Sequence, residues 1–137
     1  MNQARLNELT ATLLRGSLGL MYLTHGLVLK ILIFGLAGTA SYFASIGLPA
    51  WLGYVTAIGE SVGGALLLLG VQTRLVALAL SPTLLGAIIW VHARNGWVFS
   101  APGGGWEYPA FLLVLSVAVA ALGSGAYALQ RSSRATV

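Results

Sequence analysis

The run TATLLRGSLGLMYLTHGLVLKILIFG, from Thr10 to Gly35, decides how the rest of the chain must fold. It is long enough to cross a bilayer as a helix, because about 20 apolar residues span the hydrocarbon core. It nevertheless contains three basic side chains, those of Arg15, His25 and Lys30. A charge in the hydrocarbon costs roughly 2.5–3.5 kcal/mol on insertion scales, so each needs a partner, a water-filled cavity or a route to the interface.

The composition agrees with a membrane protein. The 137 residues are 58% hydrophobic and 7% charged, with a mean hydropathy of +0.88. Soluble domains contain about 25% charged residues, so this chain cannot cover a water-facing surface and lipid is its expected solvent. The net charge of +4 suits basic helix ends at a membrane, and we expect no nucleic-acid partner. The absence of cysteine excludes disulfides, thiol redox chemistry and thiolate metal sites.

The apolar runs predict an all-α integral membrane four-helix bundle, with residues 1–137 as a single membrane domain. The expected helices cover approximately residues 10–34, 49–71, 74–93 and 109–129. Residues 37–47 are less apolar, and Tyr42 and Phe43 would anchor them as a short interfacial helix between the first and second spans. Ser81-Pro82 predicts a kink in the third helix.

Four spans place both termini on one side of the membrane, and the arginines indicate which side that is. Arg5, Arg74, Arg131 and Arg134 would lie with the termini, against Lys30 and Arg94 on the other side. By the positive-inside rule, we expect the termini to be cytoplasmic.

A central group of charges is predicted around Glu60, near the middle of the second span. At 1.5 Å of rise per residue, Glu60 lies within reach of Arg15 or His25, so we expect it to be buried and paired with one of them. The simpler interpretation is a structural pair that sets the register of the helices. His25 would then be a hydrogen-bonded core side chain.

A second group is predicted at the outer surface, where Glu107 could reach Lys30, His92 or Arg94. We place ligand binding or chemistry in this outer half of the bundle. The glycines at 103–105 suit a mobile lid over it. The alternative is a well-anchored interface in which the glycines form a tight loop and Lys30 only extends to the headgroups.

Five sequence pieces resemble the DoxX family of small four-helix membrane proteins, and the resemblance extends from about Arg15 to Leu129. They read LLRGSLGLMYLTHG, FASIGLP, GESVGGALLLLGVQTR, VHARNGW and GGGWEYP. The positions that correspond to the motifs of the family are Arg15, His25, Gly26, Lys30, Glu60, Arg74, His92, Gly96, Trp106, Glu107 and Tyr108. The family takes its name from a subunit of a membrane complex that oxidises thiosulfate and reduces quinone.

The resemblance implies a quinone-linked oxidoreductase subunit in the plasma (inner) membrane of a bacterium or archaeon. A quinone is then the candidate cofactor, and a partner oxidoreductase subunit the candidate protein partner. The candidate catalytic residues are His25, Glu60, His92 and Glu107, since a carboxylate or histidine can donate the protons that quinone reduction needs. The candidate binding residues are Arg15, Tyr22, Lys30, Trp106 and Tyr108.

Other functions remain open from the sequence. The chain could be a non-enzymatic module that binds a small apolar molecule or lipid, or that anchors a partner enzyme. A haem between His25 and His92 is conceivable, although their estimated depths differ. Transport would require the chain to oligomerise. We predict no metal site, because two histidines far apart in sequence have no diagnostic spacing.

Overall fold

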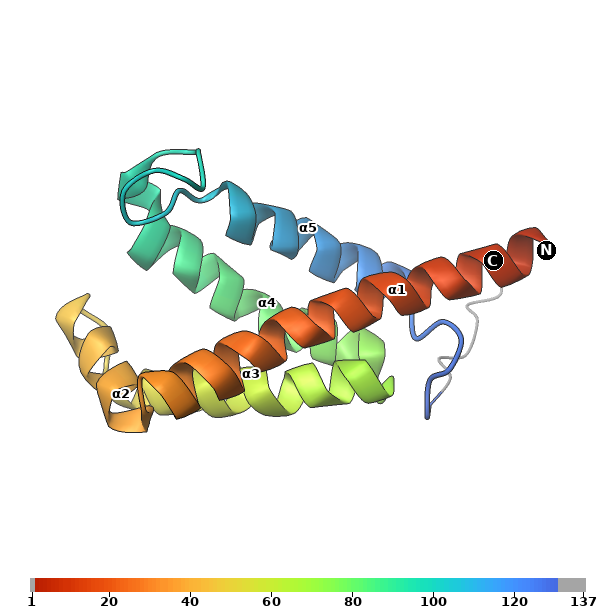
Figure 1. Cartoon of the computed structure of the whole chain (residues 1–137), viewed down its shortest axis with the longest axis horizontal. Helices are drawn as coiled ribbons and strands as arrows, with labels where there is room; N and C mark the ends of the chain where they lie inside the picture. Colours follow the sequence, from red (N-terminus) through yellow and green to blue (C-terminus); the bar gives the residue numbers. More distant parts are fainter. Residues whose placement is uncertain (1, 131–137) are drawn as a thin grey trace.

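The computed structural model of this chain describes residues 2–130, and they form a helical structure without strands (Figure 1). The first long rod joins α1 (Gln3–Leu23) to the π-helix η1 (Thr24–Ile33). The others are α3 (Trp51–Leu69), α4 (Thr73–Gly86) with its extensions η2 (Ala87–His92) and η3 (Ala93–Asn95), and α5 (Glu107–Leu122). The short helix α2 (Leu36–Ser45) lies between the first and second rods. The predicted all-α fold class is confirmed.

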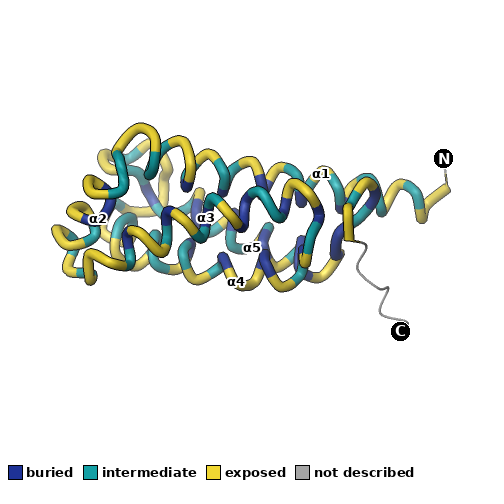
Figure 2. The backbone as a smooth tube through the Cα atoms, turned by 90° about the horizontal axis from the view of Figure 1, so that it is seen from below, coloured by how far each residue is buried: buried dark blue, intermediate teal, exposed yellow. Residues whose placement is uncertain are grey.

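Three of the rods are long and apolar enough to cross a membrane, those at Gln3–Ile33, Trp51–Leu69 and Thr73–Asn95. The fourth, α5, is equally apolar in character but spans only 16 residues. Exposed leucine, isoleucine and valine side chains run along the outside of the rods, where Figure 2 shows exposed residues on every helix. Such a surface is stable in lipid and not in water, so this is a membrane protein.

The rods form two antiparallel hairpins. The first rod packs on α3, α4 packs on α5, and further contacts join α3 to α4 and α1 to α5. Figure 1 shows the start of α1 and the end of α5 at one end of the molecule, with α2 and the α4–α5 connection at the other. We call these the terminal end and the cap end. Residues 96–106, the α4–α5 connection, are named the cap loop.

Two helix boundaries differ from the sequence prediction. The first helix begins at Gln3 and not near Thr10, because the Asn2 side chain accepts a hydrogen bond from Arg5 N at 3.0 Å and caps a polar first turn. The fourth ends at Leu122 and not near Leu129, because Gly123 has a φ of 83°. The chain then folds back on α3, where Leu129 N donates to Leu69 O at 2.9 Å.

The α1–α3 contact is close because glycines face it. A Cβ on Gly26 would lie 2.5 Å from Ser61 N, and one on Gly64 would lie 2.5 Å from Leu23 N. Backbones can approach this far only where no side chain stands between them. Gly26 therefore brings the end of the first rod directly against the part of α3 that carries Glu60.

The arginines Arg131 and Arg134, which contributed to the topology prediction, lie outside the described residues. Of the other basic side chains used there, Arg5 and Arg74 lie on the helices that begin at the terminal end, and Arg94 lies in η3 at the cap end. This leaves the predicted orientation of the termini as a proposal.

Candidate functional site

An ion pair between Lys30 and Glu60 lies within the spans. Lys30 Nζ is 2.6 Å from Glu60 Oε2, and the two side chains are 20% and 8% exposed. Side chains on a helix lean toward its N-terminus, so the Lys30 stem extends back from η1 to the level of Glu60 on α3. Glu60 is buried, as predicted. The prediction that its partner is Arg15 or His25 is wrong, because the Gly26–Ser61 contact puts Lys30 beside it instead.

Arg15 has a different role, at the terminal end. Its side chain is 2% exposed and donates hydrogen bonds to four backbone carbonyls. The acceptors are Leu67 and Leu68 (2.7 Å for the latter) at the end of α3, with Ser124 (2.8 Å) and Ala126 (3.5 Å) after α5. The Leu67 and Leu68 carbonyls carry the partial negative charge of the C-terminus of α3, which a buried guanidinium complements. Fifteen residues of helix, roughly 20 Å, separate Arg15 from Lys30.

Tyr22 and His25 occupy the rod between those two cations. Tyr22 is 1% exposed, and its hydroxyl donates to Leu80 O at 3.3 Å while lying near Ser116 of α5. His25 is half-buried, with Nδ1 2.9 Å from Met21 O. This contact requires the proton on Nδ1, which leaves Nε2 outside the bond. Tyr22 is therefore a core residue, and His25 keeps a ring nitrogen for other partners.

The π-helix η1 changes the angle about the helix axis between the His25 and Lys30 side chains. In an α-helix, residues five apart are rotated by about 140°, so the two side chains would lie on different faces. A π-helix pairs residue i with i+5, which places them about one turn apart. The wider turn continues into Phe34, whose N–H donates to Leu29 O at 2.8 Å.

The remaining sequence candidates lie around the cap loop. His92 Nδ1 is 2.9 Å from Gly104 O, and Asn95 Nδ2 donates to the Gly103 and Gly104 carbonyls at 2.9 Å. Gly103 and Gly104 have φ values of 81° and 74°. The glycine run thus forms a tight, hydrogen-bonded loop, which agrees with the alternative to a mobile lid.

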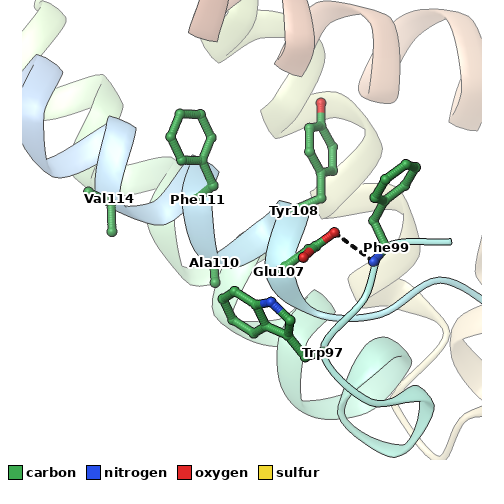
Figure 3. Close-up of a pocket in the computed structure, with 7 residues that line it drawn as sticks. All are labelled: Trp97, Phe99, Glu107, Tyr108, Ala110, Phe111 and Val114. Atoms are coloured by element: carbon green, nitrogen blue, oxygen red, sulfur yellow. Dashed lines mark hydrogen bonds between the residues drawn. The ribbon is translucent and has the colours of Figure 1, made fainter. Parts of the chain in front are cut away.

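Glu107 begins α5 and closes the cap loop from the other side. Its Oε1 accepts a hydrogen bond from Phe99 N at 2.8 Å (Figure 3). The Trp106 and Trp97 rings pack edge to face, with their centroids 4.4 Å apart. The neighbouring Tyr108 is 48% exposed. The prediction that Glu107 reaches Lys30, His92 or Arg94 is therefore wrong. A backbone N–H in its own loop satisfies the carboxylate at far less entropic cost than a distant side chain.

Apart from Arg15 at the terminal end, the predicted site residues form two groups. One is the Lys30–Glu60 ion pair between the first rod and α3, with Tyr22 and His25 on the same rod as Lys30. The other holds His92, Trp106, Glu107 and Tyr108 at the junction of η2, the cap loop and α5. Within residues 2–130, no hydrogen bond or ion pair joins the two groups, so the single outer cluster expected from the sequence does not form.

Comparison with known proteins agrees with these features. The sequence profile of the DoxX family matches residues 10–93, more than half of the chain. The chain is also similar to "Putative oxidoreductase CatD" of Bacillus subtilis (strain 168), at 37% identity over 122 residues, which cover 89% of this chain and 85% of the relative. The chain belongs to the DoxX family. No solved structure matches it.

The DoxX match separates the two groups of residues. Arg15, Lys30 and Glu60 fall inside the matched range, together with both histidines. Trp106, Glu107 and Tyr108 fall outside it. The ion pair therefore lies in the part of the chain that the DoxX profile describes, while the carboxylate at the cap loop does not.

Sequence reasoning missed two polar residues near the Lys30–Glu60 ion pair. Thr39 of α2 is 4% exposed, and its hydroxyl donates to Lys30 O at 2.9 Å, which holds the short helix against η1. Ser61 lies under Gly26 and donates to Ala57 O at 2.7 Å. The available signal for the first was a threonine among the polar residues of the short helix, directly after the first span. Among the described residues, no group of three or more metal-binding side chains occurs.

Proposed function

We propose that this protein is the membrane subunit of a quinone-linked oxidoreductase and that it binds the quinone headgroup at the Lys30–Glu60 pair. The observation that carries the proposal is the ion pair itself. Two charges 2.6 Å apart lie within the spans, and the lysine end is partly exposed. A charged pair is expensive to keep in hydrocarbon, and replacing it by apolar side chains often stabilises a protein. Its presence is better explained by binding than by stability.

The pair has the chemistry that a quinone headgroup requires. The Lys30 ammonium has three donors, and Glu60 uses one of them. Another can donate to a quinone carbonyl oxygen that enters from the lipid side. Glu60 and His25 can each hold or pass a proton, and reduction of a quinone to a quinol takes up two protons with two electrons. The tail of a quinone would stay in the apolar surroundings.

The electrons would come from a partner subunit. The chain contains no cysteine, and its described residues include no cluster of metal-binding side chains. The oxidoreductase name of the Bacillus subtilis relative supports a redox role. In this proposal the DoxX chain supplies the quinone site and the protons, while the partner carries the electron donor.

Quinone content of the purified chain tests the proposal. The parent and the Lys30→Gln/Glu60→Gln double variant would be purified in detergent and extracted with organic solvent, and quinone per chain would be measured by chromatography. The two amides can still hydrogen-bond to each other, so the fold is expected to persist while the charges are lost. Arg94→Gln, which changes an exposed cation at the cap end, is the matched control.

We expect the parent and Arg94→Gln to retain quinone above the level carried by their bound lipid, and the double variant to retain only that level. Equal quinone in all three proteins would refute the site. A parent without quinone above the lipid level would instead favour the second possibility raised by the sequence, a non-enzymatic module that anchors a partner enzyme.

The proposal also includes an orientation. With Arg5 and Arg74 toward the terminal end and Arg94 at the cap end, the positive-inside rule favours cytoplasmic termini. The membrane would be the plasma (inner) membrane of a bacterium or archaeon. The Lys30 charge does not count against this orientation, because Glu60 balances it.

A further inference from the structure

An open pocket of about 780 Å³ lies at the cap end, on the α4–α5 hairpin. It is separate from the Lys30–Glu60 pair. The cap loop contributes Trp97 and Phe99, and α5 contributes Glu107, Tyr108, Phe111 and Val114 (Figure 3). Its volume is in the range of small-molecule binding sites. All but one of these six side chains present apolar or aromatic surface, and the exception is the carboxylate.

Glu107 brings an unbalanced negative charge to this pocket. Its Oε1 accepts the Phe99 N–H, and within residues 2–130 its Oε2 takes no hydrogen bond. The ion pairs of the described chain are Arg5–Glu8 and Lys30–Glu60, so no cation of residues 2–130 neutralises Glu107. A carboxylate in apolar surroundings is costly unless a cation approaches it.

The aromatic side chains around Glu107 favour the same kind of ligand. Trp97, Phe99 and Tyr108 are 53%, 66% and 48% exposed. Aromatic faces attract an ammonium group through the quadrupole of the ring, and their bodies suit the boundary between headgroups and hydrocarbon. The pocket therefore combines a free carboxylate oxygen with several aromatic surfaces at one end of the spans.

Below this end the pocket continues as an apolar strip. Phe111 and Val114 are three residues apart on α5, share one face of it, and are 64% and 68% exposed. In Figure 3 they lie along the helix away from Glu107. A ligand that fills the whole pocket must therefore be cationic at one end and apolar along its length.

We propose that this pocket binds an amine-bearing phospholipid of the phosphatidylethanolamine type. Its primary ammonium donates to Glu107 Oε2 among the aromatic side chains, and an acyl chain lies on Phe111 and Val114. A trimethylammonium headgroup carries a charge but has no N–H donor, so it fits the aromatic surface and not the free oxygen. A headgroup with only negative charge is repelled by Glu107.

The proposal can be tested by native mass spectrometry of the purified chain with lipids that share the same acyl chains. Phosphatidylethanolamine, phosphatidylcholine and phosphatidylglycerol would be titrated separately, and the first bound lipid counted. We expect the parent to bind phosphatidylethanolamine about tenfold more tightly than either of the others, the size of a charge-assisted hydrogen bond.

Two variants separate headgroup from chain. Glu107→Gln keeps an oxygen for Phe99 N but removes the charge, so the tenfold preference should fall to about twofold or less. Phe111→Ala should weaken all three lipids by a similar factor and leave the preference. Glu8→Gln, which removes a carboxylate of α1, is the control and should match the parent. Circular dichroism would establish that each variant remains helical.

The proposal is overturned if the parent binds the three lipids equally, or if Glu107→Gln keeps the full preference. It is also overturned if phosphatidylcholine binds as tightly as phosphatidylethanolamine, since the aromatic surface alone would then account for binding. None of these outcomes depends on quinone, so failure here leaves the proposed function untouched.

Discussion

The Lys30–Glu60 pair allows a quantitative prediction of how substitutions change the free energy of unfolding. This prediction is separate from the proposed role of the pair in binding. Replacing Glu60 by leucine leaves the Lys30 ammonium without its partner in the spans. Replacing both residues, as Lys30→Met/Glu60→Leu, removes the two charges together and leaves apolar side chains of similar length. We expect the single change to be strongly destabilising and the double change to recover most of the lost stability.

The magnitude follows from the burial of the two partners. Breaking a fully buried ion pair costs about 3–5 kcal/mol. Polar contacts between membrane helices reach only about 1.7 kcal/mol, because the unfolded state in the membrane also finds partners. Lys30 is 20% exposed, so its orphaned ammonium can move partly toward a polar environment. We therefore expect about 2–3 kcal/mol for Glu60→Leu, less for Glu60→Gln, and a coupling energy of about 2 kcal/mol between the two positions.

A double-mutant cycle measures this coupling directly. Parent, Glu60→Leu, Lys30→Met and the double variant would be unfolded by a denaturing detergent titration in mixed micelles and followed by circular dichroism. A coupling energy below about 0.5 kcal/mol would refute the pair. A stable double variant that has lost its quinone would support the view that the charges are retained for binding, whereas a double variant as unstable as Glu60→Leu would show that the pair is needed for folding.

Three further predictions concern other parts of the chain. Arg15→Leu removes the guanidinium from four backbone carbonyls, of which Ala126 O still accepts the Thr12 hydroxyl, and should destabilise the protein by about 3 kcal/mol or more in the same titration; a loss below about 1 kcal/mol would contradict this role. Gly26→Ala puts a Cβ 2.5 Å from the α3 backbone and should cost about 1–3 kcal/mol, whereas Gly16→Ala meets nothing within 4 Å and should be neutral or stabilising. Because the chain has no cysteine, Ser100→Cys and Gln3→Cys report topology cleanly: an impermeant maleimide added to intact cells should label the former and not the latter, and the reverse pattern would overturn the proposed orientation.

The sequence alone determined the helices and their number. Each apolar run must satisfy its own backbone hydrogen bonds in lipid, which only a helix does within one segment. The breaks at Gly35, Gly70 and the cap loop separate these runs, and the short helix between the first two rods was visible in its mixed polarity. The burial of Glu60 also followed from sequence, because a carboxylate in the middle of a span has nowhere to go except the protein interior.

Tertiary structure decided which partner each charge found. Partner choice depends on how far two helices approach and at what register, and single residues such as Gly26 set that distance by having no side chain. Arg15 donates its hydrogen bonds to backbone carbonyls, because the chain after α5 folds back to the end of α3. This contact joins residues far apart in the sequence, so no local pattern predicts it. Glu107, in contrast, has a local partner. Its carboxylate accepts a hydrogen bond from Phe99 N, only eight residues away, and closing so short a loop costs little entropy. The local sequence thus determined where each charged residue lies along its helix. The tertiary contacts between segments determined which hydrogen-bond or ion-pair partner it has.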